Sequence, residues 1–350
     1  MALQWLILVG AIWLQSINGT NSNFPAYSSE FKRLLSLSQL QLNNLAFASD
    51  AGKLLGFISG VVASHLPLWL VLLIGSLLGL VGYGVQYLFL SDHIPFLSYG
   101  IVFLLTVLSG NSICWINTVC YMITISTFPF DRHVAVGLTT SYIGLSAEIY
   151  TDLVSVFFPS SPSSSPAETA KAYLLLNSVS PLVVCVFCAP IVRCANNGES
   201  RRLEGGFVVM SKCMASTPAS IATIMAPMSA SFFLLLNKTT LSLYISTAVI
   251  GLCTGAITSI AVSTTTELFG AKNFSVNHNI VVANIPIGSF VFGNAAALLY
   301  RSKINTEDGR CMGTECYQTT FVIWGFLCLF GSFLSIILFV RTKKMYAQRL

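Results

Sequence analysis

The chain has 350 residues, of which 54% are hydrophobic and only 9% are charged, and its mean hydropathy is +0.75. Soluble globular domains carry about 25% charged residues, so this composition excludes that class and indicates a membrane protein. The formal net charge of +5 is spread over loops and the C-terminal tail. It therefore fits a membrane topology and gives no support for nucleic-acid binding.

Long apolar runs predict an all-α polytopic membrane protein, since about 20 apolar residues cross the hydrocarbon core of a bilayer. The predicted spans are residues 3–19, 40–63, 68–90, 97–127, 134–158 and 172–192, followed by 217–236, 241–266, 276–300 and 319–340. The first run is short enough to be a signal peptide. No basic residue precedes it and Gln4, Trp5 and Gln15 interrupt it, so we expect a retained span. We expect a polar loop at residues 20–33.

A polar stretch, CANNGESRRLEGG, divides the chain into two groups of spans. We predict a six-span bundle at residues 1–193, a cytoplasmic linker at 194–216, a four-span bundle at 217–340 and a basic cytoplasmic tail at 341–350. Lys and Arg are most frequent near the linker and the tail, which predicts that both termini are cytoplasmic. The sequence does not distinguish the plasma membrane from an endomembrane.

The second predicted span carries a polar stripe made of Asn43, Asp50 and Lys53. A charged residue near the centre of a spanning helix costs about 2.5–3.5 kcal/mol on insertion scales, so it calls for a partner or a function. Two interpretations remain open. Asp50 and Lys53 form an i,i+3 ion pair that neutralises itself, or this helix lines a polar pathway.

Other polar side chains also fall within predicted spans. Together with the charged pair, the candidate pathway residues are Asp50, Lys53, Asn111, Asn117, Glu148, Asn277 and Asn284. Amides in lipid usually bond to neighbouring helices, but next to a helix break, such as the one expected at Pro286, they can also contact a solute. We interpret His278 as an interface residue rather than a proton relay.

Small-residue motifs and loop residues complete the set of candidates. The glycine pairs Gly56/Gly60, Gly75/Gly79 and Gly251/Gly255 have the four-residue spacing that lets two helices approach closely, so we expect them to serve in packing. Asn18 and Asn237 are in glycosylation sequons on the predicted outer side. Cys311 and Cys316 lie in the last outer loop, where they form a disulfide or remain free thiols.

Several segments of the chain carry a family resemblance. The segments NGTNSNFPAYSSEFK, LSQLQLNNLAFASDAGKLLG, GNSICWINTVCYM and TTTELFGAKNFSVNHNIVVANIPIGSFVFG resemble the plant nodulin-like branch of the major facilitator superfamily, which includes the nuclear-fusion-defective type proteins. The resemblance covers nearly the whole chain. It implies a major facilitator fold, a transporter of a small solute or ion, and no prosthetic group or metal. We do not expect an enzyme.

The sequence departs from this family in two ways. Major facilitators normally have two six-helix bundles, and here the second bundle lacks two spans before residue 211. The superfamily's charged motif after the second span is also absent, because Ser64 and His65 stand where those charges would be. Two functions therefore remain open: a solute transporter working by alternating access, impaired by its shortened second half, or a truncated, non-transporting membrane protein that associates with full-length relatives through its helices.

Overall fold

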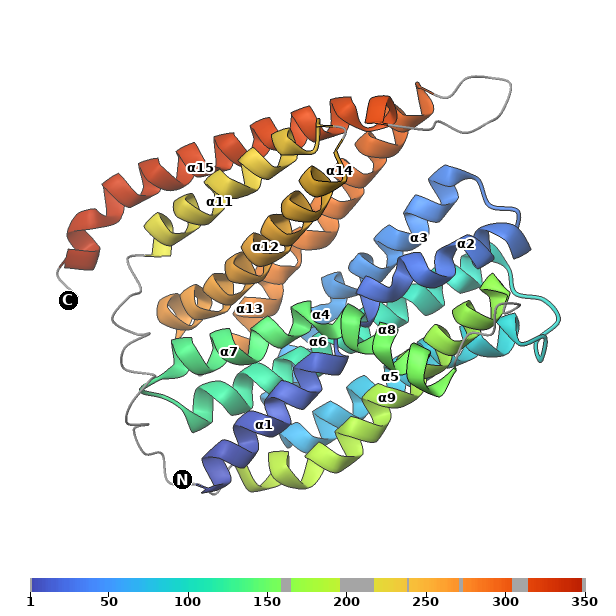
Figure 1. The fold of residues 1–350 in the computed structure, drawn as a ribbon. Coiled ribbons are helices and arrows are strands. Elements are labelled where there is room, and N and C mark those ends of the chain that lie inside the picture. Colours follow the sequence, from blue (N-terminus) through green and yellow to red (C-terminus); the bar gives the residue numbers. More distant parts are fainter. Residues whose placement is uncertain are drawn as a thin grey trace. The chain divides into compact units, whose positions relative to one another are not determined.

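The computed structural model describes residues 2–158, 165–195, 217–237, 239–270, 273–303 and 314–347. Every element in this part of the chain is a helix (Figure 1). The elements up to residue 195 are α1 (Ala2–Ile17), η1 (Thr20–Asn23), α2 (Phe24–Leu34), α3 (Gln39–Ala51), η2 (Gly52–Leu55), α4 (Gly56–Ala63), α5 (Leu68–Leu90), α6 (Tyr99–Thr127), α7 (Arg132–Gly144), α8 (Ser146–Phe157) and α9 (Pro166–Ala195). Those after it are α11 (Thr217–Leu234), α12 (Thr240–Phe269), α13 (Phe274–Val282), α14 (Asn284–Arg301), η3 (Thr314–Cys316) and α15 (Gln318–Ala347).

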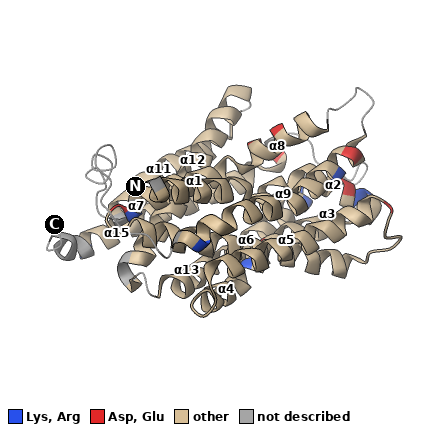
Figure 2. Ribbon diagram, turned by 90° about the horizontal axis from the view of Figure 1, so that it is seen from below, with Lys and Arg blue, Asp and Glu red and all other residues tan. Residues whose placement is uncertain are grey.

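Within the described residues, seven helical segments are long and apolar enough to cross a membrane. They are Gln39–Ala63, Leu68–Leu90, Tyr99–Thr127, Pro166–Cys194, Thr240–Thr266, Phe274–Arg301 and Gln318–Arg341. Each coincides with a predicted span. The predicted span at 134–158 is instead two helices, α7 and α8. The predicted span at 217–236 corresponds to α11, which has 18 residues. Most of the described helical surface carries no charged side chain (Figure 2), as a protein embedded in lipid requires.

The starts of three spans follow directly from the sequence. The side chain of Ser38 accepts a hydrogen bond from the backbone N–H of Gln41, whose own side chain bonds back, so a capping box begins α3. At the start of α6, the side chain of Ser98 accepts a hydrogen bond from the backbone N–H of Ile101. Pro67 precedes α5, which covers the predicted residues 68–90. Local capping chemistry therefore places these three boundaries.

The first predicted span does not end in a polar loop, and that expectation is wrong. Helix α1 ends at Ile17, residues 18 and 19 are not helical, and the chain then continues as η1 and α2 (Figure 1). Tyr27, Glu30 and Phe31 on α2 are buried. The segment is polar in composition, but its Thr20 and Asn23 side chains bond to neighbouring helices. The connection between α2 and α3 is a short turn at residues 35–38.

The chain forms two compact units. The first contains residues 1–202 and 265–294, and the second contains 203–264 and 295–350. This grouping differs from the predicted division at residues 194–216, because α13 packs against α4 and α6 of the first unit. The predicted linker lies almost entirely outside the described residues.

In the first unit, α5 packs along both α6 and α9. A Cβ atom on Gly75 would lie 2.6 Å from Cβ of Trp115, and one on Gly79 would lie 2.7 Å from Oγ of Ser112. These two glycines therefore let α5 and α6 approach closely, which is the packing role that their spacing predicts. Two clusters of buried apolar side chains fill the unit, one around Trp115 and one around Tyr150.

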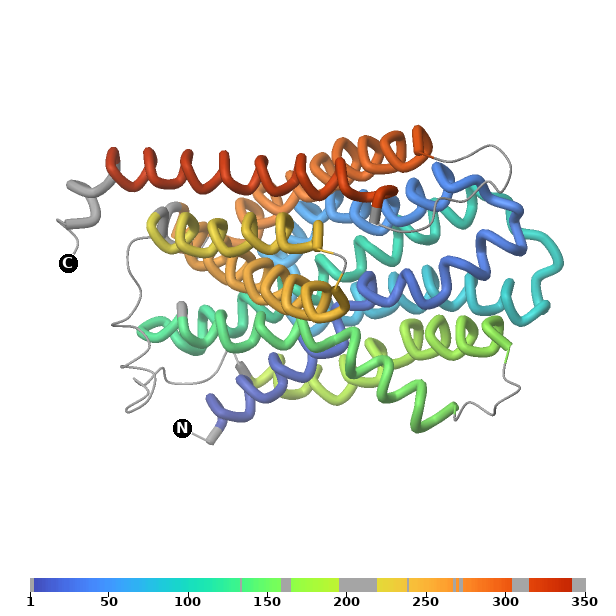
Figure 3. Tube along the Cα trace, turned by 45° about the horizontal axis from the view of Figure 1, so that its top comes forward, coloured from blue at the N-terminus to red at the C-terminus, as the bar shows by residue number. Residues whose placement is uncertain are grey.

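In the second unit, α11 and α15 lie side by side (Figure 3). A Cβ atom on Gly325 would lie 2.8 Å from Cζ of Phe233, and Oγ of Ser229 donates to the carbonyl oxygen of Gly325 over 2.7 Å. The glycine pair on α12 behaves differently. A Cβ atom on Gly251 or on Gly255 would meet no atom within 4 Å.

Candidate functional site

The second span is interrupted in its interior. Between α3 and α4 the helix tightens into the 3₁₀ segment η2, which begins at Gly52. The side chain of Asn111 on α6 reaches this point, and its Nδ2 donates to the carbonyl oxygen of Gly52 over 2.9 Å. Its Oδ1 accepts from Nε1 of Trp115 over 2.9 Å. Asn111 therefore binds the backbone at the break and is itself held by Trp115, and a 3₁₀ segment inside a helix is typical of functional hinges.

The backbones of α3 and α6 touch beside this break. A Cβ atom on Gly110 would overlap the carbonyl oxygen of Ser49, and one on Gly52 would overlap the carbonyl oxygen of Val107. No side chain separates the two helices at this crossing. Any residue larger than glycine would have to push one backbone away from the other.

Asp50, near the end of α3, and Lys53, within η2, form an ion pair at the break. Nζ of Lys53 lies 2.6 Å from Oδ1 of Asp50, and their side chains are 13% and 23% exposed, in that order. The predicted i,i+3 pair is therefore present. Both side chains remain partly exposed, and the lining role stays a prediction.

A polar contact joins α4, α6 and α13 one to two turns beyond the ion pair. The hydroxyl groups of Ser59 and Thr118 are 2.8 Å apart, and Nδ2 of Asn279 donates to Oγ1 of Thr118 over 3.0 Å. Oγ of Ser275 donates to the carbonyl oxygen of Gly60 over 3.2 Å. We call this set the α4–α6–α13 contact.

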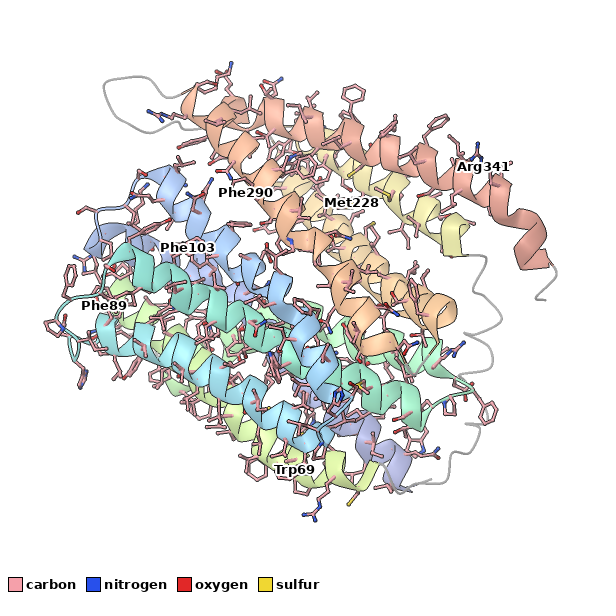
Figure 4. The ribbon with its side chains drawn as sticks, turned by 180° about the vertical axis from the view of Figure 1, so that it is seen from behind. Trp69, Phe89, Phe103, Met228, Phe290 and Arg341 are labelled. Carbon is pink, nitrogen blue, oxygen red and sulfur yellow. The ribbon has the colours of Figure 1, made fainter. Side chains whose placement is uncertain are left out.

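The glycines of α4 permit this contact. A Cβ atom on Gly56 would lie 2.9 Å from Oδ1 of Asn279, and one on Gly60 would lie 2.6 Å from the carbonyl oxygen of Ser275. Phe47 on α3 extends the packing toward α14, because its ring centroid is 5.0 Å from that of Phe290. Figure 4 labels Phe290 on α14. The predicted packing glycines Gly56 and Gly60 thus hold α13 against the broken second span.

The break in the first span forms a second polar cluster, which the sequence did not predict. The segment from residue 18 to residue 23 bonds to four helices. Asn18 Nδ2 donates to Asn117 Oδ1 on α6, and the N–H of Gly19 donates to Ser146 Oγ on α8. Asn23 Nδ2 donates to Asn177 Oδ1 on α9, and Thr20 Oγ1 accepts from Tyr83 Oη on α5. These four bonds are 2.8–3.1 Å long. The signal was present as the dipeptide Asn18-Gly19 directly after an apolar run.

This cluster changes the interpretation of two predicted residues. Asn18 is 1% exposed and its Nδ2, the atom that a glycan would occupy, is bonded to Asn117 and to the carbonyl oxygen of Ile113. Glycosylation of Asn18 is therefore incompatible with this fold, and that prediction is corrected. Asn117 contacts Asn18 rather than the Asp50–Lys53 pair.

The remaining candidates are not gathered at the break. Glu148 on α8 and Asn284 at the start of α14 are exposed, and Asn277 on α13 is half-buried. None of these three side chains bonds to another residue that the structure describes. Their pathway role stays a prediction. The expected interruption near Pro286 is present, since α13 ends at Val282 and α14 begins at Asn284.

The loop predictions have mixed outcomes. Asn237 is exposed in the turn after α11, so its glycosylation stays a prediction. Cys316 is disulfide-bonded. Its predicted partner, Cys311, lies outside the described residues, so the pairing itself stays a prediction.

Replacing Asn111 with alanine tests its place at the break. The carbonyl oxygen of Gly52 and Nε1 of Trp115 would both lose their partners in a buried setting, which costs about 1–3 kcal/mol for each unsatisfied group. We expect a clearly lower Tm for the purified protein in detergent. Asn294→Ala is the control, because that amide donates only to the carbonyl of Phe290 in its own helix. Equal Tm values for the two variants would contradict the assignment.

Two family models match this chain. The nodulin-like family model matches residues 4–250, which is more than half of the chain. This chain belongs to the nodulin-like family. The model described as "NFD4, C-terminal domain" matches residues 203–348 of this nodulin-like protein.

A curated relative agrees with this assignment. The nodulin-like chain is 28% identical to the Arabidopsis thaliana protein NUCLEAR FUSION DEFECTIVE 4 over an alignment of 529 residues, which covers 98% of this chain and 89% of the relative. The alignment is much longer than 350 residues, so the relative contains residues with no counterpart here, as expected from a shortened second half.

Among solved structures, a bacterial homologue of the human drug peptide transporters PepT1 and PepT2 is similar, with a TM-score of 0.63, 10% identity and coverage of 98% of this chain and 99% of that chain. The major facilitator proton:xylose symporter XylE bound to 6-bromo-6-deoxy-D-glucose has a TM-score of 0.57, 10% identity and 95% coverage of both chains. These likenesses show that the nodulin-like protein has the major facilitator fold. Together with the seven long apolar helical segments among its described residues, this fold makes it an integral, multi-pass membrane protein.

Proposed function

We propose that this nodulin-like protein transports a small polar solute across its membrane by alternating access. The observation that carries the proposal is the break at η2, where the Asp50–Lys53 ion pair lies at a non-α-helical backbone segment in the interior of a spanning helix. Interrupted spans that carry charged or amide groups form the solute sites of many transporters, because water and solute replace the missing helical partners.

The packing around the break supports movement. The α4–α6–α13 contact consists of glycine backbones, hydroxyl groups and one amide. Such groups hold helices closely, yet each hydrogen bond can be exchanged for one to water when the helices separate. Alternating access requires contacts that form in one state and open in the other.

The Asp50–Lys53 pair favours a solute with polar groups of its own. A carboxylate and an ammonium side by side can each bind a complementary group, so an amino acid, a peptide, a sugar or a small organic acid fits this site better than an apolar molecule does. The related fold of transporters for peptides and for xylose is consistent with this range.

The test is uptake by purified protein in liposomes. We would present labelled alanine, dialanine, xylose, adenosine and malate as a panel and measure initial rates with and without protein. Saturable, protein-dependent uptake of at least one solute is the expected result. Two results together would refute transport by this form. Correctly folded protein would take up no solute from a widened panel, and inserting the relative's additional residues before Ser211 would restore uptake.

A specific observation favours the alternative of a non-transporting partner protein. Gly251 and Gly255 have the spacing of a helix-pairing motif, but no atom would contact a Cβ at either position. In that alternative, α12 pairs with a helix of a full-length relative. Co-isolation of differently tagged chains, lost in Gly255→Leu but retained in the control Gly100→Leu, would support it.

A further inference from the structure

His278 on α13 is a buried imidazole without a partner for one of its nitrogen atoms. The residue is 5% exposed, and its Nδ1 makes no hydrogen bond. The ring stacks on Phe274, with centroids 5.0 Å apart and planes at 14°, and it meets Tyr121 on α6 edge-on, with centroids 5.2 Å apart. We call this arrangement the His278 clamp. It lies next to Asn279 of the α4–α6–α13 contact.

Few charged groups face the clamp. α13 packs against α4, η2 and α6. Helix α4 contributes no titratable side chain, η2 contributes Lys53, which is paired with Asp50, and α6 contributes Cys114, Cys120 and Tyr121. The hydroxyl group of Tyr121 lies near Gln15 and Thr140, which are neutral. No carboxylate in the described part of the chain forms an ion pair with His278.

These surroundings suit a neutral imidazole and disfavour a charged one. Protonation would place a positive charge and a second N–H donor in a buried clamp, where no described carboxylate pairs with the ring. Cation–π attraction from Phe274 and Tyr121 offsets only part of the lost hydration. The protonated form is therefore favoured by any state in which α13 moves away and water reaches the ring.

We propose that His278, which the sequence indicated to be an interface residue rather than a proton relay, is instead a proton-binding site, and that its protonation releases α13 from α4 and α6. This inference rests on the proposed transport function and names the coupling ion for it. A proton taken up from water at Nδ1 or Nε2 charges the ring, the clamp loses stability, and the hydrogen bonds of Ser59, Thr118 and Asn279 open with it. Deprotonation allows the contact to form again. Histidine serves widely as a switch of this kind.

Hydrogen–deuterium exchange of the full chain in lipid nanodiscs tests this without any solute. Backbone exchange would be measured by mass spectrometry at pH 5.5 and 7.5, with labelling times adjusted for the intrinsic pH dependence of amide exchange. We expect several-fold faster exchange at pH 5.5 in peptides covering α4 and α13. His278→Gln should remove this difference.

Two further variants make the outcome unambiguous. His278→Phe keeps a ring in the clamp and cannot titrate, so it replaces the glutamine variant if that one does not fold. His65→Gln is the control, because His65 is exposed after α4 and bonds to the carbonyl oxygen of Val61 in its own turn. A pH-dependent difference that persists in both His278 variants, or that is absent from the wild-type protein, overturns the proton site. Failure of solute uptake with this difference intact would refute transport and leave the proton site standing.

Discussion

Replacing Gly110 with alanine is expected to prevent the protein from folding. A Cβ atom at this position would overlap the carbonyl oxygen of Ser49, which belongs to the backbone of α3. Overpacking a core typically costs about 1–3 kcal/mol when side chains can shift. Here a backbone has to shift, and a Cβ atom on Gly52, at the same crossing, would likewise overlap the carbonyl oxygen of Val107. We therefore expect a cost above that range.

The measurement is the yield of monodisperse protein after purification in mild detergent, followed by its Tm. Gly100→Ala is a matched control on the same helix, because a Cβ atom there would meet nothing within 4 Å. The control should match the wild-type protein in both quantities. A well-folded Gly110→Ala variant with an unchanged Tm would show that α3 and α6 do not cross at this point.

Much of the fold could be predicted from the sequence, because apolar length and capping residues are local signals. The span at 68–90 is confirmed at both ends, where Pro67 precedes it and a turn follows Leu90. The break near Pro286 is also confirmed. A proline among the first residues of α14 gives up an N–H that has no partner within the helix, so the chain restarts there readily.

The first span was misjudged because the missing information was tertiary. The residues after Ile17 are polar, and by composition they indicate a loop. In the structure, partners from three helices, α6, α5 and α9, bond to Asn18, Thr20 and Asn23. Only the fold brings those partners together, so single-sequence reasoning could not distinguish this internal break from a surface turn.

The candidate site was predicted in part. The spacing of Asp50 and Lys53 predicted their ion pair, and that pair is present. The role of Asn111 at the break and the burial of His278 and Asn279 were not predicted, because they depend on contacts between residues far apart in the chain. For the same reason, the sequence assigned α13 to the second group of spans, whereas it packs with the first unit.

Substitutions of Asp50 and Lys53 should distinguish the two interpretations of their ion pair. Asp50→Asn leaves the ammonium of Lys53 without its partner at a site where that group is only 13% exposed. Lys53→Met leaves the carboxylate alone in the same way. Each single change should lower the free energy of unfolding by about 1–3 kcal/mol. If the pair binds solute, each change should also reduce uptake at least about tenfold, because a tenfold effect corresponds to only about 1.4 kcal/mol of binding free energy.

The double variant Asp50→Asn/Lys53→Met decides the question, because it removes both charges and leaves none uncompensated. If the pair only neutralises itself, the double variant should recover both Tm and uptake. If the pair contacts the solute, Tm should recover while uptake stays low, and this is the result we expect. The matched control is the other i,i+3 pair, Glu30–Arg33 on α2, with the variant Glu30→Gln/Arg33→Met. Arg33 is largely exposed, so this variant should leave uptake near the wild-type rate. Full uptake by the Asp50→Asn/Lys53→Met variant would remove the ion pair from the transport pathway.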